Sequence, residues 1–319
     1  MTRILAFCIL AFLAPLASAA SLLVLNKEDA TLSIFDAATG QPRNANIPTG
    51  NGPHEVEVSG DGSLAFVSNY GTAQAPGTSL SVIDLRTGKE RARVDLGELR
   101  RPHGLAVQGQ SVYFSAENAQ HVARYDAMKD RVDWRFSTGQ QGTHMVLVAR
   151  DGTVITANIQ SDNVSFITPK GETGTQVLVA TGKGPEGMDL TPDGRQLWTA
   201  NSAGGSISIV DVATKKLVKT FDVGTKRSNR LKFTPDGAVA LVSDLTSGEL
   251  LIVDARTQAV KSRLRIGGGA SGILVAPDGS RAYVAAASEG RVVIVDLKKW
   301  EVAGEIRTGR GPDGMAWVP

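Results

Sequence analysis

The sequence predicts an all-β protein that folds as a seven-bladed β-propeller with four-stranded antiparallel blades. Turn signals of the type Pro-Asp-Gly or Asp-Gly recur along the chain, and the last four of their aspartates are 42 or 43 residues apart. Short runs rich in Val and Ile follow these turns, as in β-strands. After the N-terminal segment, long stretches with the helical period are missing. Four short strands per repeat bury both faces of their sheet only by stacking radially on neighbouring repeats.

The first 19 residues have the pattern of a secretory signal peptide. A positively charged start is followed by an apolar run over 4–16 and by Ala17-Ser18-Ala19, which suits a cleavage site. The apolar run is short for a bilayer span, which needs about 20 residues. Cys8, the single cysteine, lies inside this run, so the mature chain has no disulfide. We therefore expect a periplasmic or secreted monomer, with one propeller domain over 20–319 and no membrane span after cleavage.

The repeats define six complete blades and one shared blade. The six complete units are 51–97, 98–140, 141–183, 184–226, 227–270 and 271–310. The C-terminal run 311–318 reads as a first strand with nothing after it, whereas 21–26, 31–36 and 45–50 read as second to fourth strands. Joining the two chain ends into one blade closes the ring and hides sheet edges that would otherwise invite aggregation.

One repeat carries a family resemblance. The stretch GPEGMDLTPDGRQLWTANSAGGSISIVDVATKK, at 184–216, contains P-x-G, PDG, a YVTN-like tetrad and a V-I-D run in order. It resembles the YVTN-repeat β-propellers, a family that includes YncE-like periplasmic or secreted propellers. The resemblance extends over nearly all of the mature chain and implies the fold, but the family is too diverse to imply one activity. Units 98–140 and 141–183 depart most, since they lack the Asp-Gly turn and the V-I-D run respectively.

Three of the four histidines occupy the same place in successive repeats. They are His54 in NGPHEVEV, His103 in RRPHGLAV and His144 in QGTHMVLV. The first strand of each propeller blade lines the central channel, so we expect the three side chains to meet at its mouth. The same register round the ring gives His54, His103, His144, Glu186, Asn229, Ser271 and Asp313.

These histidines are candidate metal ligands. Three imidazoles suit zinc, copper or iron and leave a coordination position open for water or a ligand. The alternative interpretation is a wet channel mouth in which polar side chains bind water. The fourth histidine, His121, is expected on the surface.

Acidic and basic residues near this register are further candidates. Glu186 and Glu117 are candidate catalytic groups that would handle protons. The candidate ligand-binding residues are Arg230, Asn229, Asp313, Glu55, Arg101 and Arg227. Together with Arg100, Lys183, Lys226 and Arg310, the arginines predict a basic rim that would attract a small anion. The alternative is a set of dispersed, solvated charges, some of them paired with nearby glutamates.

Three functions follow from these patterns. The leading hypothesis is an exported propeller that binds a small anionic ligand, a metal ion or cofactor, or a partner protein at the histidine-lined mouth. The second is a metal-dependent enzyme, because propellers of similar build include lactonases and lyases, in which an ion polarises a carbonyl or activates water. The third is nucleic-acid binding, which a net charge of +2 and an aromatic content of 5% disfavour.

Overall fold

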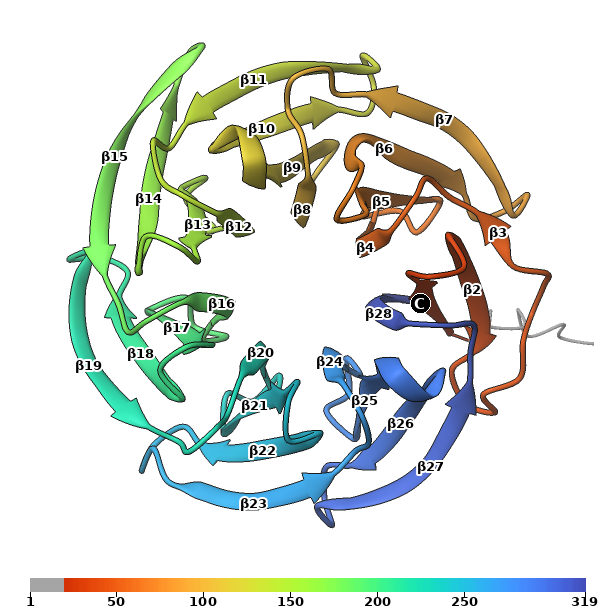
Figure 1. Cartoon of the computed structure of the whole chain (residues 1–319), viewed down its shortest axis with the longest axis vertical. Helices are drawn as coiled ribbons and strands as arrows, with labels where there is room; N and C mark the ends of the chain where they lie inside the picture. The colour runs from red at the N-terminus through yellow and green to blue at the C-terminus, as the bar shows by residue number, and fades with distance from the viewer. Residues whose placement is uncertain (1–19) are drawn as a thin grey trace, which may run out of the picture.

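The computed structural model describes residues 20–319 and confirms the seven-bladed propeller (Figure 1). Its 28 strands form seven antiparallel sheets of four strands each, arranged as a ring. Two 3-10 turns, Glu117–Ala119 and Ala287–Glu289, are the only helical elements of the described residues. No helix in this part of the chain has the length and hydropathy to cross a membrane. The predicted signal peptide, residues 1–19, lies outside the described residues.

Six blades are continuous in sequence, with the strand nearest the channel first. Blade 2 contains β4 (Pro53–Val58), β5 (Leu64–Gly71), β6 (Pro76–Asp84) and β7 (Lys89–Asp95). Blade 3 contains β8 (Pro102–Gln108), β9 (Ser111–Ala116), β10 (His121–Asp126) and β11 (Arg131–Ser137). Blade 4 contains β12 (Thr143–Val148), β13 (Val154–Asn158), β14 (Asn163–Lys170) and β15 (Thr173–Ala180).

The remaining continuous blades follow the same order. Blade 5 contains β16 (Pro185–Leu190), β17 (Gln196–Asn201), β18 (Ser206–Asp211) and β19 (Lys216–Asp222). Blade 6 contains β20 (Ser228–Phe233), β21 (Val239–Asp244), β22 (Glu249–Asp254) and β23 (Val260–Arg265). Blade 7 contains β24 (Ala270–Val275), β25 (Arg281–Ala286), β26 (Arg291–Asp296) and β27 (Glu301–Arg307).

Blade 1 joins the two ends of the described chain, as predicted. Its sheet order is β28 (Pro312–Val318), β1 (Ser21–Asn26), β2 (Thr31–Asp36) and β3 (Ile47–Pro48). The pairing of β28 with β1 runs from Ser21 opposite Val318 to Asn26 opposite Pro312. Beyond the strands, the Lys27 amide donates to the carbonyl of Gly311, and Asp29 forms an ion pair with Arg310. Figure 1 shows β28 at the inner side of this blade, with β2 and β3 farther out.

The repeated motif residues have structural roles. In the turn after β16, Asp193 accepts hydrogen bonds from the Thr191 hydroxyl and the Arg195 amide, and Gly194 has a φ of 73°. Aspartate and glycine are therefore required here by the geometry of the turn. The Asp211 side chain likewise accepts from the Thr214 amide in the next turn. These repeated aspartates are committed to turns and are unsuited to chemistry at the channel.

In blades 1 and 2, the asparagine at the end of the YVTN-like tetrad binds the chain segment that precedes the blade. Asn69 donates through Nδ2 to the Ser81 hydroxyl on the next strand, while its Oδ1 accepts from the Gly50 amide. In blade 1, Asn26 makes the equivalent bonds to Ser33 and Gly309. These buried networks satisfy polar groups that would otherwise be costly inside the fold.

Glycines on the inner strands allow neighbouring blades to approach closely. They directly follow the channel register at Gly104, Gly187, Gly272 and Gly314. A Cβ added at Gly272 would lie 2.1 Å from the Asp313 carbonyl oxygen of the next blade. Inner strands can therefore touch backbone to backbone only where a side chain is absent.

We expect Gly272→Ala to lower the free energy of unfolding by about 1–3 kcal/mol, because the added methyl group must push two blades apart. Urea denaturation measures this loss. Gly60→Ala is the matched control, since a Cβ there meets nothing within 4 Å, and we expect it to change stability by less than about 0.5 kcal/mol. Equal effects of the two substitutions would contradict this account of the inner strands.

Candidate functional site

The seven residues of the predicted register line one cavity at the channel mouth. This cavity has a volume of about 340 Å³, and His54, His103, His144, Glu186, Asn229, Ser271 and Asp313 all contribute to its wall. Each side chain comes from the start of an inner strand, in successive blades. The connections between second and third strands also reach this cavity, with Lys27, Glu28, Leu245 and Ala287, and so does Tyr70 near the end of β5. The structure therefore brings together residues that the repeat pattern predicts to be neighbours.

The three histidine rings lie in a row, tilted against one another, with His103 in the middle. Its ring centroid lies 4.1 Å from that of His54 and 3.5 Å from that of His144. Ligating atoms cluster in two overlapping groups, His54–Glu55–His103 and His103–Glu117–His144, and within each group the atoms lie within 4.8 Å of one another. His103 belongs to both groups. The predicted set of three imidazoles is thus replaced by two sets of two imidazoles and one carboxylate.

His103 is the most enclosed of the three, with 1% of its surface exposed, and its Nδ1 has no hydrogen-bond partner. Burial lowers the pKa of His103 well below its ordinary value, and the neighbouring His144 and His54 lower it further. Burial also lowers the pKa of His54, against the opposing effect of Asp313. Both imidazoles are therefore held in the neutral form, which is the form that binds metal ions.

A chain of hydrogen bonds holds His144. Its Nδ1 lies 3.1 Å from Oε2 of Glu117, which also accepts from the Tyr70 hydroxyl at 3.0 Å. Arg101 donates to that hydroxyl at 2.9 Å and lies over the Tyr70 ring. Burial raises the pKa of Tyr70 to about 12, and the Glu117 charge adds to this, so the phenol keeps its proton. The Nε2 atom of His144 is buried without a partner.

Two carboxylates at the mouth, from blades 5 and 1, each have one unpaired oxygen. Glu186 accepts through Oε1 from the Asn229 side-chain amide, and its Oε2 is buried with no partner. Asp313 lies near His54 and Lys27 through Oδ2, at 3.4 and 3.5 Å, and its Oδ1 is buried with no partner.

Directly below the mouth, an ion pair crosses the channel. Arg230 of blade 6 donates to Oε1 of Glu55 in blade 2, which lies on the far side of the ring. Burial alone would raise the pKa of Glu55, but Arg230 lowers it to about 2. Glu55 and Arg230 also line a second cavity of about 690 Å³ beneath the pair, together with Glu57 and Lys232. Burial raises the pKa of Glu57 to about 7 there.

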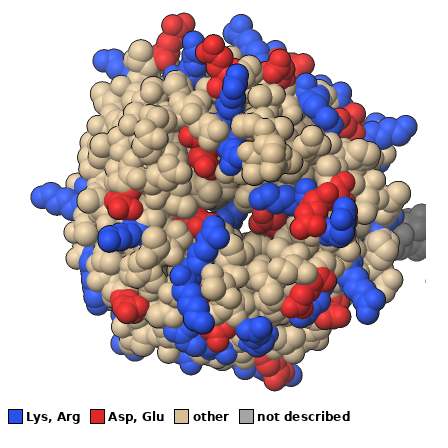
Figure 2. Space-filling view, in the orientation of Figure 1, with Lys and Arg blue, Asp and Glu red and all other residues tan. Residues whose placement is uncertain are grey.

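The predicted basic rim is mixed in charge. Of the predicted arginines, Arg227 lines the mouth, Arg101 packs behind Tyr70, and Arg230 lies deeper in the channel. Glu28, Glu186 and Asp313 share the cavity wall with Lys27 and Arg227. Figure 2 shows blue and red atoms together around the central opening.

Part of the chain matches a known family. The sequence model of the family described as "YNCE-like beta-propeller" matches residues 125–267. This match and the seven-bladed ring fit the YncE-like propeller family. The matched part of the chain includes His144, Glu186 and Asn229, whereas His54, His103 and Asp313 lie outside it. No curated protein matches the sequence.

Solved structures resemble this propeller at low sequence identity. Hydrazine synthase of Kuenenia stuttgartiensis is 17% identical with a TM-score of 0.73, over 90% of this chain and 92% of that one. A putative 6-phosphogluconolactonase of Bacteroides uniformis is 14% identical with a TM-score of 0.77, over 94% of this chain and 100% of that one. Dihydro-heme d1 dehydrogenase NirN in complex with DHE is 17% identical with a TM-score of 0.66, over 93% of this chain and 74% of that one. Similarity at this level shows the fold alone.

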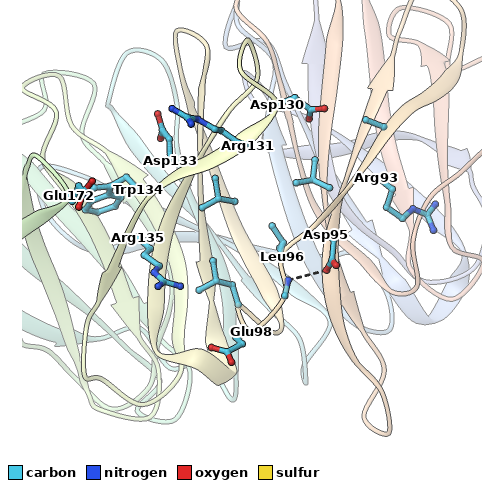
Figure 3. Close-up of a pocket in the computed structure, with 15 residues that line it drawn as sticks. Arg93, Asp95, Leu96, Glu98, Asp130, Arg131, Asp133, Trp134, Arg135 and Glu172 are labelled. Carbon is cyan, nitrogen blue, oxygen red and sulfur yellow. Dashed lines mark hydrogen bonds between the residues drawn. The ribbon is translucent and has the colours of Figure 1, made fainter.

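A larger groove of the propeller lies at the outer edge, between β7 and β11 (Figure 3). It has a volume of about 1000 Å³, and none of the predicted site residues lines it. Its wall mixes three arginines with five carboxylates, including Arg93, Arg135, Asp95 and Glu172. Because charges of both signs alternate on solvated edge strands, no ligand class follows from this groove.

Sequence reasoning missed Tyr70 and Lys27 as residues of the mouth. Tyr70 directly follows the FVSN tetrad and lies near the end of β5, which extends to Gly71. The ring of Tyr70 meets those of His54 and His103 edge-on, with centroids 5.2 and 5.3 Å apart. The available signal was the aromatic side chain directly after the tetrad.

Proposed function

We propose that this propeller binds a divalent transition-metal ion at the channel mouth, with His103, Glu117 and His144 as protein ligands. The observation that carries this proposal is the clustering of one ligating atom from each of these residues within 4.8 Å. Two imidazoles and one carboxylate are a recurring ligand set for zinc and for non-haem iron. Three protein ligands leave further coordination positions open towards the cavity. Export, predicted from residues 1–19, is part of the same proposal.

The spacing of His144 and Glu117 supports one shared ion. Two atoms that bind one ion at about 2.1 Å lie roughly 3.0–3.4 Å apart at octahedral or tetrahedral angles. Nδ1 of His144 and Oε2 of Glu117 are 3.1 Å apart. A metal ion can thus replace the proton between the two atoms without moving either residue far.

The other group, His54–Glu55–His103, is less suitable. Glu55 is already neutralised by Arg230, and metal binding would leave that buried guanidinium without its carboxylate. An unpaired buried charge is costly. We therefore place the ion on the side of His103 that faces His144.

The backbone conformation of Arg101 supports a functional role for the hydrogen bonds that connect Arg101, Tyr70 and Glu117. Arg101 has a φ of 56°, in the left-handed region that favours glycine. At the equivalent position, five other blades have a glycine with φ between 58° and 69°, namely Gly52, Gly142, Gly184, Gly269 and Gly311. In blade 3, a non-glycine residue in this left-handed conformation lowers the stability by about 1 kcal/mol. This loss is offset by the Arg101 side chain, which donates to the Tyr70 hydroxyl, and that hydroxyl in turn donates to Glu117.

We expect the untagged protein to retain about one equivalent of zinc, copper or iron after dialysis, and His103→Ala to lose it. His103 is common to both groups, so its removal destroys either arrangement. Metal content is measured by mass spectrometry after loading with each ion. His121→Ala is the control, because His121 does not line the cavity and should leave the content unchanged. Failure of every ion to bind stoichiometrically would refute the proposal.

Two further variants locate the ion. Glu117→Gln should abolish binding, whereas Glu55→Gln should preserve it if the ion lies beside His144. Arg101→Gly removes the side chain that positions Tyr70 and gives the turn the residue used by most other blades. We expect it to weaken metal binding about 10-fold without loss of the folded ring, which circular dichroism reports. The reverse order of the two glutamate variants would move the ion to the His54 group.

The enzyme and nucleic-acid hypotheses gain no specific support. The likeness to a putative 6-phosphogluconolactonase extends to the fold alone at 14% identity. The mouth mixes acidic and basic groups, whereas a nucleic-acid site needs a continuous basic surface. We accordingly propose binding of an ion and assign no reaction.

A further inference from the structure

Two buried carboxylates line the mouth from blades 5 and 1, neither of which holds a proposed metal ligand. Glu186 begins the inner strand of blade 5 and Asp313 that of blade 1, and both line the cavity. Only 4% of the Glu186 surface and 7% of the Asp313 surface are exposed. Each carboxylate keeps one buried oxygen, Oε2 of Glu186 and Oδ1 of Asp313, without any hydrogen-bond partner.

The protein itself supplies no donor for these two oxygens. The other oxygen of each carboxylate is occupied, since Asn229 donates to Oε1 of Glu186, and Lys27 and His54 lie next to Oδ2 of Asp313. An ionised carboxylate only accepts hydrogen bonds. Leaving such an acceptor buried and unpaired is costly, so a ligand that fits this cavity must bring donors.

The positions of the charged side chains in the cavity wall indicate which kind of hydrogen-bond donor the cavity favours. Among the residues that line the cavity, Lys27 is a third exposed at its side chain and Arg227 is exposed, whereas Glu186 and Asp313 are buried. The buried Arg230 interacts electrostatically with both carboxylates, but it does not line the cavity, and its guanidinium is paired with Glu55. A hydrogen bond between an ammonium group and a carboxylate is roughly twice as strong as one between neutral groups. An anion in this cavity would meet two buried carboxylates.

We infer that the cavity at the mouth, where Glu186 and Asp313 line it, is a binding site for a small molecule that carries a protonated amine. Its N–H groups donate to Oε2 of Glu186 or Oδ1 of Asp313. The cavity volume of about 340 Å³ is at the small end for ligand sites, which favours a compact amine. This inference does not depend on the metal ion, because its residues come from blades 1 and 5, whereas the metal ligands come from blades 3 and 4.

The experiment compares three probes of similar size and different charge. Ethanolamine, ethylene glycol and glycolate are titrated, in the presence of a chelator that removes metal ions, into the intact protein and followed by calorimetry or NMR. We expect saturable binding of ethanolamine, binding of ethylene glycol weaker by about 10-fold or more, and no saturable binding of glycolate. Glycolate binding as tight as that of ethanolamine would overturn the inference, and so would equal binding of ethylene glycol.

Substitutions identify the site. Glu186→Gln and Asp313→Asn keep the shape of each side chain and remove its charge, and each should weaken ethanolamine binding about 10-fold. Glu301→Gln is the matched control, because Glu301 lies exposed on β27 and should leave the affinity unchanged. Unchanged affinity in both site variants would refute the inference. Since metal ions are absent, this result is independent of whether the proposed metal site exists.

Discussion

Removal of residues 311–319 is expected to unfold the entire ring. This segment supplies β28, which pairs with β1 along its length and packs against the inner strands of blades 2 and 7. Its loss would expose Leu22, Leu23 and Val24, which are fully buried. Each large apolar side chain that loses its packing costs about 2–5 kcal/mol. Such losses exceed the total stability of about 5–15 kcal/mol of a typical domain.

The truncated chain should therefore show no cooperative thermal transition by circular dichroism and should aggregate during gel filtration. Removal of Pro319 alone is the control, because this exposed residue follows β28 and should leave the melting temperature unchanged. A truncated protein that melts like the intact one would show that six blades close the ring without β28.

Arg230→Met is expected to lower the free energy of unfolding by about 3–5 kcal/mol, because it leaves the Glu55 carboxylate buried without its partner. Urea denaturation at pH 7 measures the loss. The double variant Glu55→Gln, Arg230→Met should recover most of it, since no unpaired charge is then buried. A single variant as stable as the original protein would show that water in the channel compensates the charge.

The same ion pair makes stability depend on pH. The pKa of Glu55 falls from 4.5 to about 2 in the folded protein. A depressed pKa contributes stability that is complete above the unfolded value and is lost as pH falls through the folded value. We expect a decline between about pH 4.5 and pH 2, of roughly 3 kcal/mol from this group. Glu55→Gln should show a correspondingly smaller decline in urea denaturation at these pH values.

The sequence was sufficient for the scaffold and for the register of the mouth. The spacing of the Asp-Gly turns and the unpaired strands at the two ends predict seven blades and a shared first blade. The recurrence of His54, His103 and His144 at one place in the repeat predicts that they meet, because a ring brings equivalent positions to a common axis.

Contacts outside the repeat could not be predicted in the same way. Glu117 reaches His144 from the 3-10 turn between the second and third strands of blade 3, and Tyr70, near the end of β5 in blade 2, donates a hydrogen bond to Glu117. The repeat does not define these contacts. The Glu55–Arg230 pair joins residues 175 positions apart across the channel. The order of the blades round the ring places the two residues on opposite sides of the channel. Whether their side chains are long enough to meet depends on the width of the channel, which the repeat pattern does not give.

The pairing of β1 with β28 has a consequence for protein synthesis. A ribosome makes the three outer strands of blade 1 before the six continuous blades and their inner partner after them. Until β28 has been synthesised, the nascent chain must therefore carry β1 with a free inner edge, and the pocket lacks Asp313. Folding of this propeller can be completed only after β28 has left the ribosome, and a chain terminated before β28 would have neither a closed circle nor a finished pocket.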